Sequence, residues 1–309
     1  MPAVPERTGG AVLRTALCAL LLTAPTSRSL AGQAAARPNP PQVTRSVIAA
    51  LPTLNGKGAK IVGHLDLTRP FHTRTPWTFV AATLAASRFS VVNARIVHAG
   101  PLALCFVDEL APRCRYTLPR TASIQARFSA PVHFYSAKIV FAGAGHTDPL
   151  LLIRSGSAYG IDGGHTIFTQ LFRYDRRSNR FESVFAHATD SNNNQETRFI
   201  ARGPLRGDVI VAVPTDGPPY EYWIRVYAPK APGRQLHLVL RYRSLTGYGD
   251  GNPLAVIDSE MPNILRRLGK WRPGQSLPVP PRLPADCKPR FYLVDGGKWR
   301  VRKKIIVTG

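Results

Sequence analysis

The stretch TIFTQLFRYD-RRSN-RFESVFAHAT, residues 166–189, decides the fold class of this chain. Two runs rich in Phe, Val, Thr and Tyr flank a four-residue polar turn, a pattern typical of a β-hairpin. Aromatic and branched residues crowd both runs, so cross-strand contacts between them are expected to fix the register. These residues are Phe168, Phe172 and Tyr174 in the first run and Phe181, Val184 and Phe185 in the second.

Runs rich in residues that favour strands, mainly Val, Ile, Phe, Tyr and Thr, continue on both sides of the hairpin. Further runs are Leu102–Val107, Ala122–Phe128, His133–Gly143, Leu150–Ser155, Asp208–Val213, Tyr220–Tyr227 and Leu236–Arg243. Helical periodicity is clear only in MPNILRRLGKW, residues 261–271. The sequence therefore predicts an all-β chain of mainly antiparallel, sandwich-like sheets with one short amphipathic helix near the C-terminus.

The N-terminus has the order of a secretory signal peptide. Two arginines, Arg7 and Arg14, precede the apolar run ALCALLLTA at residues 16–24, and small residues follow up to Ala36. A run of about nine apolar residues is too short to span a bilayer, which needs about twenty. We expect residues 1–36 to be removed, with Ala31 as the alternative cleavage site, and the protein to be periplasmic or secreted rather than transmembrane.

The remaining chain divides by composition into four segments. They are a proline- and glycine-rich linker at 37–60, a first β region at 61–145, a second β region with the short helix at 146–276, and a proline-rich spacer with a basic tail at 277–309. The cut between the β regions falls at Gly143–Asp148, although the two regions are also compatible with one domain. The basic tail is expected to be poorly ordered.

The chain is strongly basic, with 41 Lys and Arg against 18 Asp and Glu. Removing residues 1–36 takes away three arginines and one glutamate and leaves 38 basic against 17 acidic side chains. Outside the cytoplasm the abundant anions are lipopolysaccharide, wall polymers and lipid head groups, so nucleic acid is an unlikely partner. The alternative is that the arginine excess reflects a GC-rich genome and no binding function.

Three cysteines follow the signal peptide. Cys105 and Cys114 lie on two alternating segments joined by a loop, and the sequence predicts a disulfide between them. Cys287, in the proline-rich segment, is interpreted as inert.

Three loops carry candidate chemistry. In TDSNNNQE, residues 189–196, oxygen ligands alternate at Asp190, Asn192, Asn194 and Glu196, which favours calcium. The sixth position lacks the glycine of an EF-type loop, and a solvated turn has the same composition. The main prediction is therefore that the protein has no cofactor, with calcium as the alternative.

The second loop is the glycine-rich RSGSAYGIDGGHT, residues 154–166. Asp162 and His165 are its best polar pair for a small binding cleft, because loops between rigid strands commonly carry binding sites. The third is SLTGYGDGNPLAVIDSEMP, residues 244–262, where Asp250, Asp258 and Glu260 are candidate acid and base residues of a glycosidase. In the structural interpretation, Asp250 belongs to a hairpin turn, and Asp258 and Glu260 precede and cap the short helix.

No catalytic or nucleotide-binding motif occurs at the required spacing. We therefore expect an exported β-rich protein that acts as a non-catalytic envelope binding or structural module through a cationic surface. The alternative is an extracytoplasmic hydrolase of glycosidic bonds.

Overall fold

The computed structural model describes residues 60–83, 88–90, 95–97, 102–110, 131–142, 148–157, 159, 164–191, 195–229, 235–247, 254–272, 275, 291–294 and 298–301. All of them belong to one compact unit, residues 43–309. The predicted signal peptide, the linker up to residue 59, the run Ala122–Phe128 and the residues Cys114, Asp162, Asn192, Asn194, Asp250 and Cys287 lie outside the described residues.

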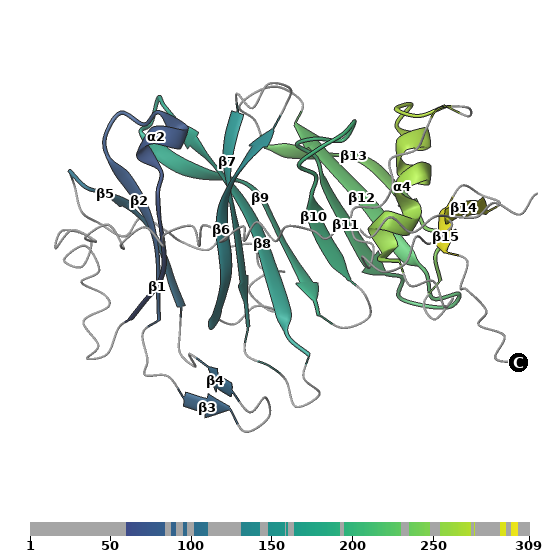
Figure 1. Ribbon diagram of the computed structural model, residues 1–309, viewed down its shortest axis with the longest axis horizontal. Helices are drawn as coiled ribbons and strands as arrows, with labels where there is room; N and C mark the ends of the chain where they lie inside the picture. The colour runs from purple at the N-terminus through teal and green to yellow at the C-terminus, as the bar shows by residue number, and fades with distance from the viewer. Residues whose placement is uncertain are drawn as a thin grey trace, which may run out of the picture. The chain divides into compact units, whose positions relative to one another are not determined.

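The first sheet has the strand order β1-β2-β5 and is antiparallel throughout. Its strands are β1 (Lys60–Asp66), β2 (Trp77–Thr83) and β5 (Leu102–Asp108), and the short helix α2 (Thr68–Phe71) connects β1 to β2 (Figure 1). Between β2 and β5 in sequence, β3 (Arg88–Ser90) pairs with β4 (Arg95–Val97). Cys105 is buried in β5, and its predicted pairing with Cys114 stays a prediction.

The second sheet joins four strands in chain order, and each neighbouring pair is antiparallel. The strands are β6 (His133–Ala142), β7 (Asp148–Gly156), β8 (Thr166–Asp175) and β9 (Arg180–Asp190). The central hairpin of the sequence prediction is thus β8 and β9. The sequence suggests a boundary between the two β regions at 143–148, and the strands on either side of it, β6 and β7, pair with each other up to Ala142 and Asp148.

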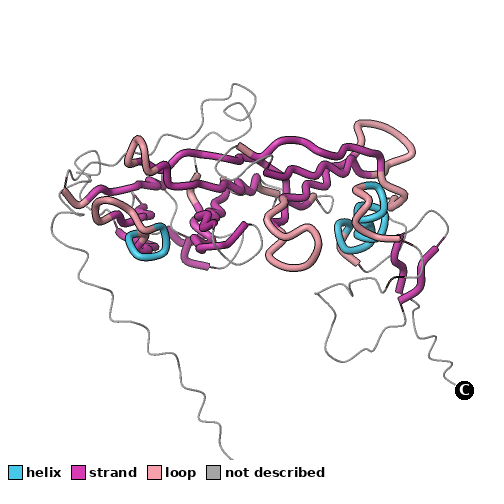
Figure 2. The backbone as a smooth tube through the Cα atoms, turned by 90° about the horizontal axis from the view of Figure 1, so that it is seen from above, coloured by secondary structure: helices cyan, strands magenta, loops and turns pink. Residues whose placement is uncertain are grey.

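The third sheet also follows chain order, and helix α4 lies to one side of it (Figure 2). Its strands are β10 (Glu196–Phe199), β11 (Val209–Pro214), β12 (Tyr222–Pro229) and β13 (Leu236–Arg243). Helix α4 spans Val256–Arg267, and a hairpin of β14 (Phe291–Val294) and β15 (Lys298–Val301) follows.

Three apolar clusters hold these layers together. One joins the first sheet to the second through Phe79, Phe106, Ile153 and Phe172. Another joins the second sheet to the third through Leu171, Phe185, Val209 and Val211. The last packs Ile257, Ile264 and Leu265 of α4 on Ile224 and Val226 of β12.

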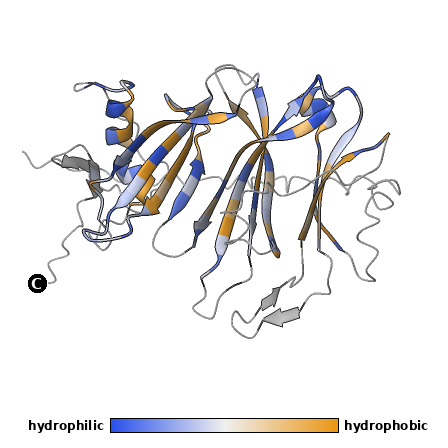
Figure 3. Cartoon of the chain, turned by 180° about the vertical axis from the view of Figure 1, so that it is seen from behind, coloured by the Kyte–Doolittle hydropathy of each residue, from blue (hydrophilic) through white to orange (hydrophobic). Residues whose placement is uncertain are grey.

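The second sheet contributes to two of these clusters because successive side chains of a strand point to opposite faces. Leu151 and Ile153 of β7 meet the first sheet, and Leu150 and Leu152 face the third. The alternation of apolar and polar residues along the strands, and the two differently coloured sides of α4, are visible in Figure 3. These findings confirm the prediction of an all-β chain of mainly antiparallel sheets with a short helix near the C-terminus.

Two expectations need correction. Helix α4 begins at Val256, so Asp258 and Glu260 lie inside its first turns and do not precede it. The C-terminal tail, expected to be poorly ordered, contains the β14–β15 hairpin. In the sequence, the apolar run FYLV and the alternating run KWRV flank Asp295-Gly296-Gly297, a combination typical of a hairpin turn.

Among the described residues, neither helix has the length and apolar character that crossing a bilayer requires.

Candidate functional site

The face of the second sheet that meets the third sheet changes character along its strands. Near one end it is apolar, where Leu150, Leu171 and Phe185 pack in the shared core. On this same face, Arg154 follows Leu152 along β7, and Thr169 precedes Leu171 along β8. Because every second side chain of a strand lies on the same face, this face is apolar in the core and polar further along the strands.

The neighbouring strand β6 extends this polar region. Ser136 pairs with Arg154, and Lys138 pairs with Leu152, so the two side chains lie on the same face as their partners. Residues that are 18 and 14 positions apart in the sequence thus come together through the register of the sheet.

A cleft of about 640 Å³ lies over this region. The second sheet and the residues after β9 form one part of its wall, and strand β10 and the segment before α4 form the other. The lining residues are Ser136, Lys138, Leu152, Arg154, Thr169, Ser191, Gln195, Glu196, Thr197, Arg198, Phe199, Leu254 and Ala255. This volume is within the usual range for a small-ligand site, which is about 300–1,000 Å³.

Three polar atoms of the cleft are buried without a hydrogen-bond partner in the part of the chain that the structure describes. They are Nε of Arg154, Oγ1 of Thr169 and Oγ1 of Thr197. Thr169 is only 2% exposed. Leaving such a group unpaired costs about 1–3 kcal/mol, so a ligand that supplies acceptors here recovers hydrogen bonds that the protein lacks.

The cationic side chains of the cleft differ in whether a carboxylate neutralises their charge. Arg198 donates to Glu196 from Nε at 2.6 Å and to Asp258 from Nη2 at 3.1 Å. Burial opposes its charge, but the hydrogen bonds to these two carboxylates outweigh burial and hold the pKa of Arg198 above its ordinary value. Across the cleft, Lys138 and Arg154 have no carboxylate partner among the described residues. The free positive charge of the cleft therefore comes from the second sheet.

Four aromatic side chains border the cleft, and we call them the aromatic rim: His133, Tyr135, Tyr159 and His165. The ring centroid of His165 lies 4.4 Å from that of Tyr159 and 5.9 Å from that of Tyr135. His133 lies 4.9 Å from Tyr159. Both tyrosines are more than one-third exposed, so part of each side chain is accessible to a ligand.

Direct contacts connect the aromatic rim to the cleft. The backbone N–H of His165 donates to Oγ of Ser191 at 3.0 Å, and Ser191 lines the cleft. Tyr135 precedes Ser136 in β6, and the charge of Arg154 acts on its hydroxyl. The rim therefore adjoins the cleft at Ser191 and Ser136.

Among the residues singled out from the sequence, His165 is placed beside the cleft, while Asp162 is outside the described residues. Asp190 ends β9 at an exposed position, and Glu196 begins β10. Both carboxylate oxygens of Glu196 accept from Arg198, at 2.6 and 3.0 Å. Because the structure does not describe Asn192 and Asn194, the calcium loop stays a prediction.

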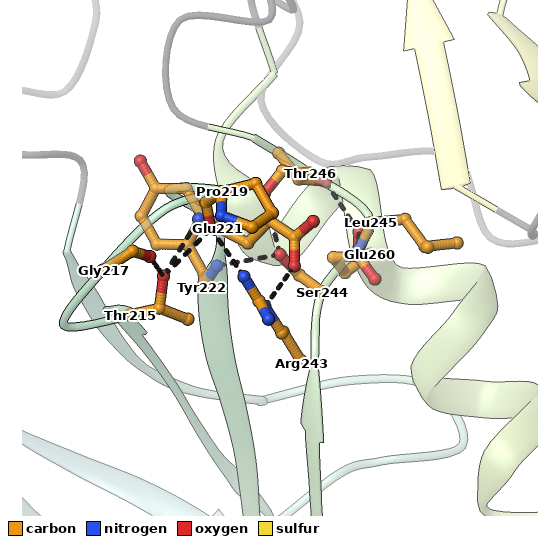
Figure 4. Close-up of polar contacts among 10 residues, drawn as sticks. All are labelled: Thr215, Gly217, Pro219, Glu221, Tyr222, Arg243, Ser244, Leu245, Thr246 and Glu260. Atoms are coloured by element: carbon orange, nitrogen blue, oxygen red, sulfur yellow. Dashed lines mark hydrogen bonds and ion pairs between the residues drawn. The ribbon is translucent and has the colours of Figure 1, made fainter.

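Asp258 and Glu260, the predicted acid and base candidates, do not line the cleft. Asp258 is 2% exposed and pairs with Arg198, as described above. Glu260 is completely buried, and Figure 4 shows part of its surroundings. Asp250 is not described.

Four donors surround the Glu260 carboxylate. Oε1 accepts from Oγ1 of Thr246 at 2.7 Å and from the backbone N–H of Leu245 at 3.1 Å. Oε2 accepts from the Tyr242 hydroxyl at 3.0 Å and from Nδ2 of Asn263 at 3.1 Å. Glu260 thus ties α4 to the end of β13, which accounts for its burial structurally.

Next to this network, a second set of contacts closes the turn before β12 (Figure 4). Oγ of Ser244 accepts from the backbone N–H of Tyr222 at 3.0 Å and donates to the carbonyl of Thr246 at 2.8 Å. Nε of Arg243 pairs with Glu221 at 2.5 Å, and its Nη2 donates to the carbonyl of Pro219.

The sequence analysis missed Lys138, Arg154 and Thr169. A signal was present: in β6 and β7 the apolar alternation of one face ends in a lysine and an arginine while the other face stays apolar. It becomes informative only once the two strands are paired.

No known family matches this chain. Neither curated proteins nor solved structures gave a match to it.

Proposed function

We propose that the chain is an exported, non-catalytic binding module of the cell envelope and that its cleft holds an anionic group of the ligand. The carrying observation is the pair Lys138 and Arg154, which present positive charge without a carboxylate partner among the described residues. A binding site needs convergent, unsatisfied polar groups in a concave surface, and this cleft has both.

The type of unpaired group supports an anion in particular. Arg154 Nε is a donor, and the hydroxyls of Thr169 and Thr197 are able to donate. Hydrogen bonds from such donors to a charged oxygen are stronger than those between neutral groups.

Two sequence features support an envelope ligand. The N-terminal pattern is that of a signal peptide, and the predicted mature chain keeps 38 basic against 17 acidic side chains. Lipopolysaccharide, wall polymers and lipid head groups are the anionic components that such a protein meets after export.

Co-sedimentation tests this proposal. The full chain is incubated with lipopolysaccharide, purified wall or anionic vesicles at about 0.05 M and about 0.5 M salt, because high salt screens unspecific attraction. We expect retention on one of the three that survives high salt. The double substitution Lys138→Gln and Arg154→Gln should lower that retention about a hundredfold in affinity, because it removes two charged hydrogen-bond donors.

The matched control is Arg176→Gln with Arg177→Gln, which removes the same charge from the exposed turn between β8 and β9. It should keep the salt-resistant retention. The proposal is wrong if the cleft variant sediments like the control, or if the unaltered chain is retained on none of the three at high salt.

A further inference from the structure

The aromatic rim indicates which kind of anionic ligand the cleft is built for; this inference rests on the proposed function. The rim adjoins the cleft at Ser191, which accepts from the His165 backbone, and at Ser136, which follows Tyr135 in β6. The charge of Arg154 acts on the Tyr135 hydroxyl, so an acidic group bound at Arg154 lies near the rim.

Two side chains of the rim, His165 and Tyr135, are uncharged at neutral pH. Burial lowers the pKa of His165, and the nearby Asp190 only partly opposes this effect. Burial also raises the pKa of the Tyr135 hydroxyl, as does its hydrogen bond with the Tyr159 side chain. The surface beside the cationic cleft thus includes the neutral rings of Tyr135 and His165, with a hydroxyl group and an imidazole nitrogen at their edges.

Such rings favour a particular partner. Tyrosine offers a flat apolar face together with a polar tip, which suits molecules that are apolar on one face and rich in hydroxyls at their edge. A sugar ring has this character, whereas an acidic peptide segment or a glycerol phosphate has no ring to stack. In such a ligand the acidic group must also be next to the sugar ring, because the cleft and the rim are adjacent.

We propose that the cleft and the aromatic rim together bind an acidic saccharide, with its carboxylate or phosphate against Lys138 and Arg154 and its sugar ring on Tyr135 and Tyr159.

Gly156 positions one of these rings. A Cβ atom at Gly156 would lie 2.6 Å from the hydroxyl oxygen of Tyr135 and 2.8 Å from its ring. Tyr135 thus rests directly on the β7 backbone, so Gly156→Ala displaces the ring while keeping Lys138 and Arg154.

Calorimetric titration of the full chain tests the proposal with four probes. Trigalacturonate and glucose 6-phosphate are acidic saccharides, and triglutamate and glycerol 3-phosphate carry the same acids without a sugar ring. We expect at least one saccharide to bind at least tenfold more tightly than its ringless counterpart. Tyr135→Ala with Tyr159→Ala should reduce this ratio to about one, and Gly156→Ala should reduce it severalfold.

The matched control is Tyr220→Ala, which removes a tyrosine that is 59% exposed outside the rim and should keep the ratio. If ringless and saccharide probes bind alike and both depend on Lys138 and Arg154, the saccharide inference is wrong and the proposed function stands. If no probe binds in a way that depends on these two cations, the saccharide inference is wrong, and the co-sedimentation experiment decides the proposed function separately. A ratio unchanged by the Tyr159→Ala and Gly156→Ala variants, each taken singly, also overturns the inference.

Discussion

Two polar clusters flank the third sheet, and they differ in whether their buried polar groups have hydrogen-bond partners. Around Glu260, each carboxylate oxygen accepts two hydrogen bonds from within the chain. In the cleft, Arg154 Nε, Thr169 Oγ1 and Thr197 Oγ1 are buried without a partner among the described residues. A satisfied network stabilises the fold, whereas an unsatisfied one lowers stability and keeps donors available for a ligand.

The comparison shows that burial of a carboxylate is a poor guide to function in this protein. Glu260 is the most deeply buried acid of the candidate set, yet its surroundings leave no free acceptor position for a substrate. The binding signal lies instead in cations and hydroxyls whose partners are missing. Substitutions in the two clusters should therefore separate stability from binding.

The largest expected effect is that of Glu260→Ala. It leaves the donors of Tyr242, Thr246 and Asn263 buried without their acceptor, and we expect a loss of about 4 kcal/mol in the free energy of unfolding. Urea denaturation measures this loss. Glu182→Ala, which removes a half-exposed partner of Arg180, should change stability by less than about 0.5 kcal/mol. Equal effects of the two variants would contradict the closed-network interpretation.

Asp208 is an intermediate case, because it is buried and has one cation, Lys270, near it among the described residues. Nζ of Lys270 lies 3.9 Å from its carboxylate, and burial raises the pKa of Asp208 to about 6. A folded-state pKa above the unfolded value means that the protonated form stabilises the fold. This contribution is complete below about pH 4 and is lost as the pH rises through about 6.

Asp208→Asn should therefore stabilise the protein by about 2–3 kcal/mol at pH 8 and change stability little at pH 3.5. Thermal or urea unfolding at the two pH values measures the difference. Asp216→Asn, at an exposed turn position, should show no such pH dependence. A loss of stability at pH 8 would mean that the ion pair with Lys270 outweighs burial.

The sequence predicted much of the fold because its strand signals are local. Strand β8 has the predicted bounds Thr166–Asp175, and β13 has the predicted bounds Leu236–Arg243. Their aromatic and branched residues favour extended backbone whatever lies across the sheet. Strand β10, with only four residues and two charges, carries no such signal and was missed.

The candidate site could be predicted only in part. His165 was singled out because loops between rigid strands commonly carry binding sites, and it lies beside the cleft, but Lys138 and Arg154 meet only after the β6–β7 register is set. The predicted start of α4 was too late because Asp258 and Glu260 were interpreted as residues that precede and cap the helix. Glu260 faces the core instead, since Tyr242 and Thr246 supply its hydrogen bonds from β13 and the loop that follows.

The smallest expected effect tests the comparison most directly, because the same substitution is made in both clusters. Thr246→Val removes hydrogen bonds to Glu260 at 2.7 Å and to Ser259 at 3.1 Å, and it should cost about 1–2 kcal/mol. Thr169→Val removes a hydroxyl that has no partner among the described residues and replaces it with a methyl group of similar size. Its stability should change by less than about 0.5 kcal/mol or increase slightly.

The effects of the two substitutions on binding should have the reverse order of their effects on stability. Thr169→Val should weaken retention of the ligand identified by co-sedimentation severalfold, since one donor of the cleft is lost, while Thr246→Val should leave it unchanged at a temperature where both variants are folded. Urea denaturation and binding isotherms on the same two proteins give all four values. A cost at Thr169 equal to that at Thr246, with no loss of binding, would mean that the Thr169 hydroxyl is already satisfied inside the chain. The cleft would then be a second structural network like that of Glu260, because its polar groups would serve the fold and leave nothing for a ligand.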